Sequence, residues 1–188
     1  MYALILTRAQ RSQRGFTLIE TMVIVAIVAV LAALAAPSFT PIIERWRVRD
    51  ATESLQSALY LARSEAIKRG GNVVIRKELT GTNGCPLASG TSDWDCGWFV
   101  FVDADSNGTL NTGEEVLQRF AAPNNIQVTR SANGAFLRFD RWGRSGPFGF
   151  SIVPVDKSTS NPAARGLCMS SGGRIRVTSD SAEIPCND

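Results

Sequence analysis

The chain has 188 residues and a nearly balanced charge, with 20 basic and 17 acidic residues, and it contains no histidine. Its length suits one modest globular domain with an attached segment. The lack of histidine excludes histidine-based catalytic triads and histidine-ligated metal sites. We find no acid, base and nucleophile constellation that would indicate an enzyme.

The N-terminal region combines a short basic segment with a long apolar one. Arg8, Arg11 and Arg14 are the only charged residues before position 16, and residues 16–36 are apolar except for two threonines and Glu20. As a helix, residues 16–36 would be about 30 Å long, which matches the hydrocarbon core of a bilayer. The arginines predict a cytoplasmic N-terminus and an exported C-terminal portion.

Glu20 is the one charged residue in the apolar segment. A carboxylate in such a segment costs about 2.5–3.5 kcal/mol on insertion scales, so it usually has a partner. One interpretation is a side chain near the membrane face that reaches the interface or stays protonated. The other is an ion pair that Glu20 forms inside an assembly of several chains.

Residues 14–20, Arg-Gly-Phe-Thr-Leu-Ile-Glu, resemble the processing motif of type IV pilins and type II secretion pseudopilins. A secretory signal peptide differs, because it is cleaved after its apolar run rather than before it. The resemblance implies that residues 1–15 are a leader, which prepilin peptidase removes by cleaving between Gly15 and Phe16. It also implies that Phe16 is then N-methylated, and that Glu20 neutralises the terminal amine of a neighbouring subunit in a filament.

Residues 37–71 are predicted to continue the helix as an amphipathic segment. Pro37 and Pro41 follow the apolar run, and proline inside a helix removes a hydrogen bond, so we expect a bend or a locally melted turn there. Gly70 and Gly71 provide the C-terminal stop. The stem would then be one helix of about 50 residues, about 75 Å long. Apolar residues recur at helical spacing at Val48, Ala51, Leu55, Ala58, Leu59, Ala62 and Ala66.

Residues 72–188 are predicted to form a β-rich globular head. Glycine and proline separate short runs of β-branched and aromatic residues, which is typical of strands joined by turns. A long helix followed by strands predicts an α+β fold class. We expect Trp94, Trp98 and Trp142 to anchor the core and its turns. The predicted strands are residues 72–77, 97–102, 115–120, 126–130, 135–141, 148–155, 166–171 and 174–179.

Four cysteines lie in the head, which favours disulfide bonds in an exported domain. Four cysteines permit three pairings. We favour Cys85–Cys96 and Cys168–Cys186, because each pair closes a short local loop. The spacing contains no Cys-x-x-Cys, which argues against a zinc or redox site.

Three further segments resemble the GspH/FimT family of minor pilins and pseudopilins. They are residues 62–69 at the end of the stem, residues 97–103 with 113–115, and residues 173–176. The resemblance implies a type IV pilin-like fold, in which a long N-terminal helix packs on a small antiparallel β-rich head. It also implies a single-pass protein of the bacterial inner membrane, with its head in the periplasm, that later joins a filament at the cell surface.

The resemblance leaves three functions open. The first is a minor pilin that acts with major and minor pilins in assembly or priming of a type IV pilus, at or near its tip. The second is a DNA-binding minor pilin for DNA uptake in natural transformation. The third is a GspH-like pseudopilin of a type II secretion system.

Residues 103–114 match the spacing of an EF-hand calcium loop, with glycine at the sixth position. The flanking segments are predicted strands rather than helices, and the family resemblance implies a polar hairpin turn. We therefore favour a turn and expect no cofactor, with calcium as the alternative. The candidate calcium ligands are Asp103, Asp105, Asn107, Thr109 and Glu114.

The C-terminal third is mildly basic, because residues 130–188 carry 8 basic and 5 acidic groups. Arg174 and Arg176 are two apart on a predicted strand, so they project to the same face. Guanidinium groups on one face suit phosphate oxygens. The alternative, which we favour, is a solvated strand face with ion pairs to Asp180 or Glu183.

The segment Gly173-Arg174-Ile175-Arg176 resembles a Gly-Arg-x-Arg motif associated with DNA binding in the FimT branch of the family. The resemblance implies double-stranded DNA as a partner. The candidate DNA-binding residues are Arg141, Arg144, Arg174 and Arg176.

Overall fold

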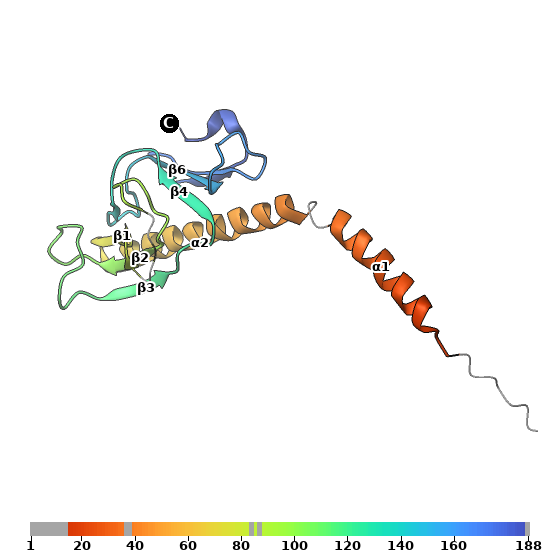
Figure 1. Cartoon of the computed structure of the whole chain (residues 1–188). Helices are drawn as coiled ribbons and strands as arrows, with labels where there is room; N and C mark the ends of the chain where they lie inside the picture. Colours follow the sequence, from red (N-terminus) through yellow and green to blue (C-terminus); the bar gives the residue numbers. More distant parts are fainter. Residues whose placement is uncertain (1–14, 36–38, 83–84, 86–87, 187–188) are drawn as a thin grey trace, which may run out of the picture. The chain divides into compact units, whose positions relative to one another are not determined.

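The computed structural model describes residues 15–35, 39–82, 85 and 88–186 (Figure 1). The chain divides into two compact units, Met1–Thr40 and Pro41–Asp188. The predicted leader lies outside the described residues except for Gly15, as does Pro37.

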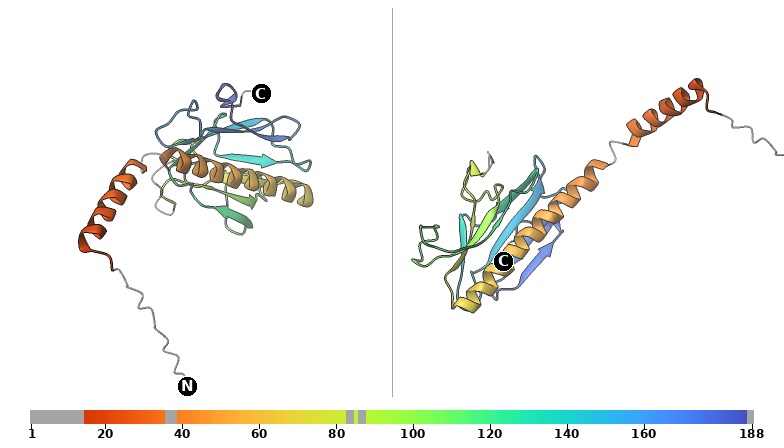
Figure 2. Two further views of the ribbon diagram at one scale, coloured as in Figure 1. Left: turned by 90° about the vertical axis from the view of Figure 1, so that its right-hand side faces the viewer. Right: turned by 90° about the horizontal axis from the view of Figure 1, so that it is seen from below.

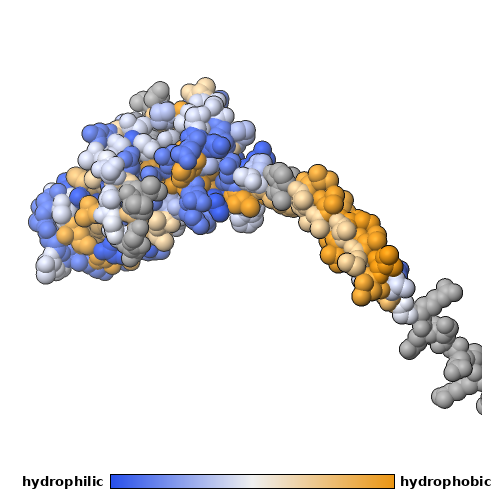
Figure 3. All heavy atoms as spheres, in the orientation of Figure 1, coloured by the Kyte–Doolittle hydropathy of each residue, from blue (hydrophilic) through white to orange (hydrophobic). Residues whose placement is uncertain are grey.

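Helix α1, Leu18–Ala35, is apolar apart from Glu20 and Thr21. Its large apolar side chains are widely exposed, from 48% for Ile24 to 77% for Leu18, and Figure 3 shows them as a hydrophobic surface. Among the described residues, no helix meets the combined length and hydropathy expected of a membrane span. The transmembrane role of residues 16–36 therefore stays a prediction.

Helix α2 runs from Thr40 to Arg69 and packs one face onto the head. The described part of the stem comprises α1 and α2, and residues 36–38 between them lie outside the described residues, so one helix with a bend or a locally melted turn stays a prediction. Pro41 is the second residue of α2, where proline is tolerated since the first-turn N–H groups have no helical partner. The buried residues of α2 are Val48, Ala51, Thr52, Leu55, Ala58, Leu59, Ala62 and Ala66, which are the predicted apolar stripe plus Thr52.

The head contains two four-stranded antiparallel sheets, and all eight predicted strands are present. The first sheet has the order β3-β2-β1-β5, and the second has the order β4-β6-β7-β8. The strands of the first are β1 Val73–Lys77, β2 Trp98–Val102, β3 Val116–Phe120 and β5 Phe136–Phe139. Those of the second are β4 Ile126–Arg130, β6 Phe148–Pro154, β7 Arg165–Met169 and β8 Ile175–Thr178.

One core of buried side chains joins α2 to both sheets, and Figure 2 shows α2 running along the strands of the head. Strand β2 is buried on both faces, which explains why it is apolar throughout. Trp98 and Val100 point into the main core. Phe99 and Phe101 form a second cluster on the outer face of the first sheet. All residues of the buried clusters belong to the second unit, so residues 41–188 hold a complete core.

The structure pairs Cys85 with Cys96 and Cys168 with Cys186, the pairing favoured from the sequence, with Cα atoms 5.6 Å apart in each. The first disulfide closes the loop before β2. Lys77 also holds this loop, because its buried ammonium donates to the carbonyl oxygens of Ala88, at 2.9 Å, and Gly90. Burial lowers the pKa of Lys77. The second disulfide ties the C-terminal end to β7.

A short 3-10 helix, Ser181–Glu183, follows β8. The Asp180 side chain caps it by accepting from the N–H of Ala182 at 3.0 Å. This turn places Glu183 beside the β8 strand, where it accepts from Arg176.

Candidate functional site

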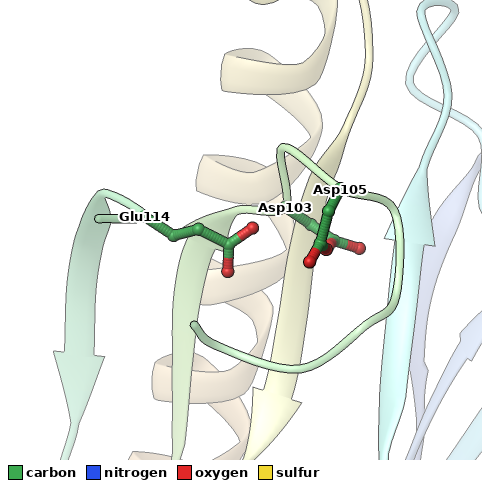
Figure 4. A group of neighbouring side chains, drawn as sticks. All are labelled: Asp103, Asp105 and Glu114. Carbon is green, nitrogen blue, oxygen red and sulfur yellow. The ribbon is translucent and has the colours of Figure 1, made fainter. Parts of the chain in front are cut away.

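The loop between β2 and β3 brings three carboxylates together. Asp103 follows β2 directly, Asp105 lies two residues further on, and Glu114 precedes β3. One oxygen of each carboxylate lies within 4.8 Å of the others. Figure 4 shows the Glu114 carboxylate facing the two aspartates. The strands on both sides confirm that the loop is a hairpin connection rather than a helix-flanked EF-hand.

N–H groups of the loop itself donate to these carboxylates. The two oxygens of Glu114 accept from the backbone N–H groups of Ala104 and Asn111, each at 2.8 Å. Asp105 Oδ2 accepts from the side-chain amides of Asn107 at 2.8 Å and Asn111 at 2.7 Å. Such contacts are typical of turns in which Asp and Asn side chains bind nearby backbone groups.

A similar bond occupies a further candidate ligand. The backbone N–H of Thr109 donates to the side-chain oxygen of Asn107 at 2.6 Å. Two of the five proposed ligand positions therefore form a local turn with each other. Hydrogen bonds within the loop therefore engage Asp105, Asn107 and Glu114.

Asp103 is fully buried and is bound by a cation from the protein itself. Its Oδ2 accepts from Arg138 Nη2 at 2.8 Å and from the Gly108 N–H at 2.9 Å, and Oδ1 accepts from the Asn107 N–H at 3.1 Å. Burial alone would raise the pKa of Asp103, but these bonds, led by Arg138, outweigh it and lower the pKa. A guanidinium beside the first ligand position repels calcium, so the geometry favours the turn.

Two arginines on the outer face of the first sheet hold this loop in place. Arg76 of β1 pairs with Phe136 of β5, and the guanidinium groups of Arg76 and Arg138 lie 6.0 and 5.7 Å from the Phe136 ring centre. Arg76 donates to the Gly108 carbonyl oxygen, and Arg138 donates to that of Ser106 at 2.7 Å. The acidic loop is therefore part of the head's packing.

Three of the four candidate DNA-binding arginines lie on two neighbouring turns, and the fourth, Arg176, lies in β8. Arg141 and Arg144 belong to the turn after β5, and Arg174 directly precedes β8. The carbonyl oxygen of Gly143 lies 3.6 Å from the position that a Cβ atom on Gly173 would occupy. The structure therefore brings these two arginine-bearing segments together.

Arg63 of α2 joins the two turns, a role that the sequence did not indicate. Its Nη1 donates to the carbonyl oxygen of Gly173. Its Cγ lies 2.7 Å from the position of a Cβ atom on Gly143, so only glycine fits there without a shift of Arg63. The available signal was the place of Arg63 beside Ala62, at the margin of the apolar stripe.

Arg174 and Arg176 have different surroundings. Arg176 Nη1 donates to Glu183 Oε2 at 2.8 Å, and the Thr178 hydroxyl donates to the same oxygen at 2.9 Å. The Thr178 bond, followed by the Arg176 bond, lowers the pKa of Glu183. Arg174 is exposed, and among the described residues no hydrogen bond holds its side chain. The interpretation that we favoured from the sequence, a strand face with ion pairs, therefore applies to Arg176.

The turn after β5 exposes Trp142, contrary to its expected role in the core. Trp94 and Trp98 are fully buried, but Trp142 is 66% exposed. The anchor of this turn is Asp140, which accepts from the backbone N–H groups of Trp142 and Arg144 at 2.9 and 2.8 Å. The Arg144 guanidinium also binds Asp140, at 3.1 Å. The Asp140 carboxylate thus anchors the turn, a role that was expected of Trp142.

Glu20 lies in the first turn of α1 and would be the fifth residue after the predicted cleavage site. The Glu20 N–H donates to Thr17 Oγ1 at 3.2 Å, so Thr17 caps the helix. The spacing Thr-x-x-Glu is that of a capping box, a signal that the sequence reading missed. A carboxylate here also interacts favourably with the helix dipole.

Comparison with known families decides the class of the chain. The family model described as Type II transport protein GspH matches residues 51–173, and the prokaryotic N-terminal methylation motif matches residues 10–36. The chain belongs to the GspH family of type IV pilin-like proteins. Members of this family are structural pilin or pseudopilin subunits rather than enzymes.

Two solved structures of one minor pilin show the same fold. The type IV minor pilin FimU of Pseudomonas aeruginosa PAO1 is similar in two crystal forms, with 22% and 21% identity and TM-scores of 0.51 and 0.54. The two matches cover 71% and 73% of this chain, and 94% and 92% of the FimU chains. The minor pseudopilin EpsH of the Vibrio cholerae type 2 secretion system matches at 15% identity and a TM-score of 0.48, covering 70% of this chain and 96% of EpsH. A comparison with curated protein sequences gave no significant match.

Proposed function

We propose that this chain is a minor subunit of a type IV pilus, which acts in assembly or priming at or near the pilus tip. Residues 16–36 hold the precursor in the bacterial inner membrane, with the head in the periplasm. Prepilin peptidase cleaves between Gly15 and Phe16, and Phe16 is N-methylated. The processed chain then joins major and minor pilins in the filament.

The observation that supports this proposal is the apolar surface of α1. Its large side chains are about half to three-quarters exposed, and a continuous apolar surface of this kind is unfavourable in water. The head has its own complete core, which contains no residue of α1. Lipid covers α1 before assembly, and the helices of neighbouring subunits cover it afterwards.

Replacing Glu20 tests the assembly step. With Glu20→Gln, we expect normal removal of the leader but at least a tenfold loss of the chain from sheared filaments. The reason is that the amine of a neighbouring subunit would lose its counter-charge in an apolar environment, which costs several kcal/mol. Immunoblots of membrane and filament fractions measure this, with mass spectrometry of the N-terminus.

A Gly15→Val variant is the control for processing. It should keep its leader and stay in the membrane fraction, because a bulky side chain would occupy the cleavage position. Normal filament incorporation of Glu20→Gln would contradict the proposed ion pair. Loss of leader removal in that variant would instead assign Glu20 to recognition by the peptidase.

A GspH-like pseudopilin of a type II secretion system uses the same stem and head, so the chain's own structure does not distinguish it. A deletion strain does. Loss of surface pili with normal protein secretion supports the pilus assignment, whereas loss of secretion with normal pili supports the pseudopilin assignment.

DNA binding is the second candidate function, and one observation favours it. The turns that carry Arg144 and Arg174 lie against each other. Arg141 and Trp142, on the same turn as Arg144, are both exposed. Exposed arginines with an aromatic side chain suit a phosphate backbone and its bases. Because Arg176 is paired with Glu183, we infer that Arg174 makes the stronger contact.

A salt series on residues 41–188 with double-stranded DNA tests this candidate. We expect Arg174→Ala to weaken binding more than Arg176→Ala, and Glu183→Gln to strengthen it by freeing Arg176. The double arginine variant should reduce the slope of log K against log salt by about 2, because each phosphate contact contributes about 0.9. A Lys68→Ala, Lys157→Ala variant removes the same charge elsewhere and should retain the slope. Absence of binding at low salt would exclude this function.

A further inference from the structure

We propose that the start of α2 forms a binding site for the phosphate headgroup of an anionic phospholipid. This inference rests on the proposed inner-membrane precursor. The site is a pocket of about 390 Å³ lined by Ile42, Arg45, Trp46, Arg49 and Arg165. It lies wholly within the unit that contains the head.

The three arginines come from two elements and converge on one pocket. Arg45 and Arg49 are four residues apart on α2, so they share a helix face with Ile42 and Trp46. Arg165 begins β7. Among the described residues, none that lines this pocket is acidic. Three guanidinium groups around an apolar floor are suited to a phosphate whose ester carries an apolar chain.

Two of the guanidinium groups are already held in position. Arg49 Nε donates to Glu53 Oε1 at 2.7 Å, and Arg165 Nη1 donates to the Ala164 carbonyl oxygen at 2.7 Å. Each bond uses one nitrogen of a group with five N–H donors, so further donors remain for a ligand. Arg45 is exposed, and no hydrogen bond joins its side chain to another described residue. Holding the arginines in place reduces the entropy lost on binding.

A negative charge limits how far along α2 an anion can bind. Beyond Arg49 the groove continues as a second pocket of about 380 Å³, which also contains Glu53. The Glu53 carboxylate would repel a phosphate there. An anion is therefore expected at the end of the groove nearest the start of α2.

The position in the sequence identifies the ligand as a lipid. No charged residue occurs between Glu20 and Glu44, and the first positive charge after this uncharged stretch is Arg45. Trp46 follows and is 73% exposed, beside Ile42 at 52%. Tryptophan and arginine that follow an apolar segment at a short distance, here with eight residues between Ala36 and Arg45, are typical of the membrane–water interface. The precursor would therefore present this pocket to the headgroup layer.

Native mass spectrometry of the full-length chain released from detergent micelles tests the site. The protein is incubated with equal amounts of phosphatidylglycerol and phosphatidylcholine, and retained lipids are counted. We expect selective retention of phosphatidylglycerol and about a tenfold reduction in an Arg45→Gln, Arg165→Gln variant, from lost charge-assisted hydrogen bonds. An Arg141→Gln, Lys157→Gln variant removes the same charge outside the pocket and should match the wild type.

Several results would overturn the inference. They are equal retention of both lipids, an equal loss in the control variant, or full competition by millimolar inorganic phosphate, which would indicate a free-anion site. Unchanged lipid retention with reduced filament incorporation of the pocket variant would assign the groove to a neighbouring subunit. Carbonate extraction of the same samples distinguishes failure of the lipid site from failure of the proposed membrane precursor. A chain that stays in the membrane but binds no lipid contradicts only the lipid site, whereas an extracted chain contradicts the membrane precursor.

Discussion

Replacing Gly97 with alanine is expected to destabilise the head by at least about 3 kcal/mol. Gly97 has a φ of +88°, which L-residues rarely adopt. An added Cβ would also overlap the carbonyl oxygen of Phe120 and lie 2.9 Å from backbone atoms of Ala121 and Ala122. The contacts are backbone atoms of the β3 end, so no side chain can rotate away, and strain adds to the φ penalty of about 1–2 kcal/mol.

Gly113 provides a matched control for this prediction. Its φ is +95°, but no heavy atom lies within 4 Å of a Cβ built there. Gly113→Ala should therefore cost only the φ term, about 1 kcal/mol. Urea unfolding of residues 41–188 measures both variants, because this segment contains the complete core. Equal losses for the two variants would show that close backbone packing at Gly97 contributes nothing.

Breaking the Asp103–Arg138 pair is expected to cost about 2–3 kcal/mol at neutral pH. In Arg138→Met the fully buried Asp103 carboxylate keeps its backbone hydrogen bonds but loses its counter-charge. Removing one partner of a buried pair is more damaging than removing both. An Arg141→Met variant changes an exposed arginine and should shift stability by less than about 0.5 kcal/mol.

The pH dependence of this effect has a defined sign. The folded state lowers the pKa of Asp103, so its contribution is present above the unfolded value of about 3.9 and is lost as pH falls through the folded pKa. Burial raises the pKa of Asp95, which has the opposite effect. The difference between wild type and Asp103→Asn removes the Asp95 contribution, because both proteins contain it.

We therefore expect Asp103→Asn to be less stable than wild type at neutral pH by about 1–2 kcal/mol, and the two to converge at low pH. Unfolding curves from pH 7 down to about 2, below the lowered pKa of Asp103, measure this. A difference that does not change with pH would exclude a role for the Asp103 charge. Stabilisation of the wild type by millimolar calcium would favour the calcium loop over the turn.

The apolar patterns predicted most of the head. The stripe from Val48 to Ala66 is the buried face of α2, because a helix repeats every 3.6 residues and must cover its apolar side. The run Gly97–Val102 was apolar on both faces, and β2 is buried on both. These features follow from local spacing, so they need no knowledge of contacts between distant residues.

The candidate sites were less predictable, because their properties depend on partners far away in the sequence. The acidic loop matched a calcium pattern until Arg138, 35 residues from Asp103, was found in contact with its first carboxylate. An ion pair between this strand and Asp180 or Glu183 was predicted, but only the structure showed that Arg176 forms it and that its partner is Glu183. Trp142 was expected to anchor its turn, but Asp140 performs that role.

By itself, the sequence determined the family-level architecture: a processing motif, an apolar stem, an amphipathic helix and eight strands. Periodicity and short motifs encode these, since each depends on neighbours within a few residues. Only the tertiary structure decided how charges are used. It showed which arginines are paired, that Arg63 joins two glycine turns, and that Arg45, Arg49 and Arg165 share a pocket. Electrostatic partners are set by distances in space, which sequence spacing does not report.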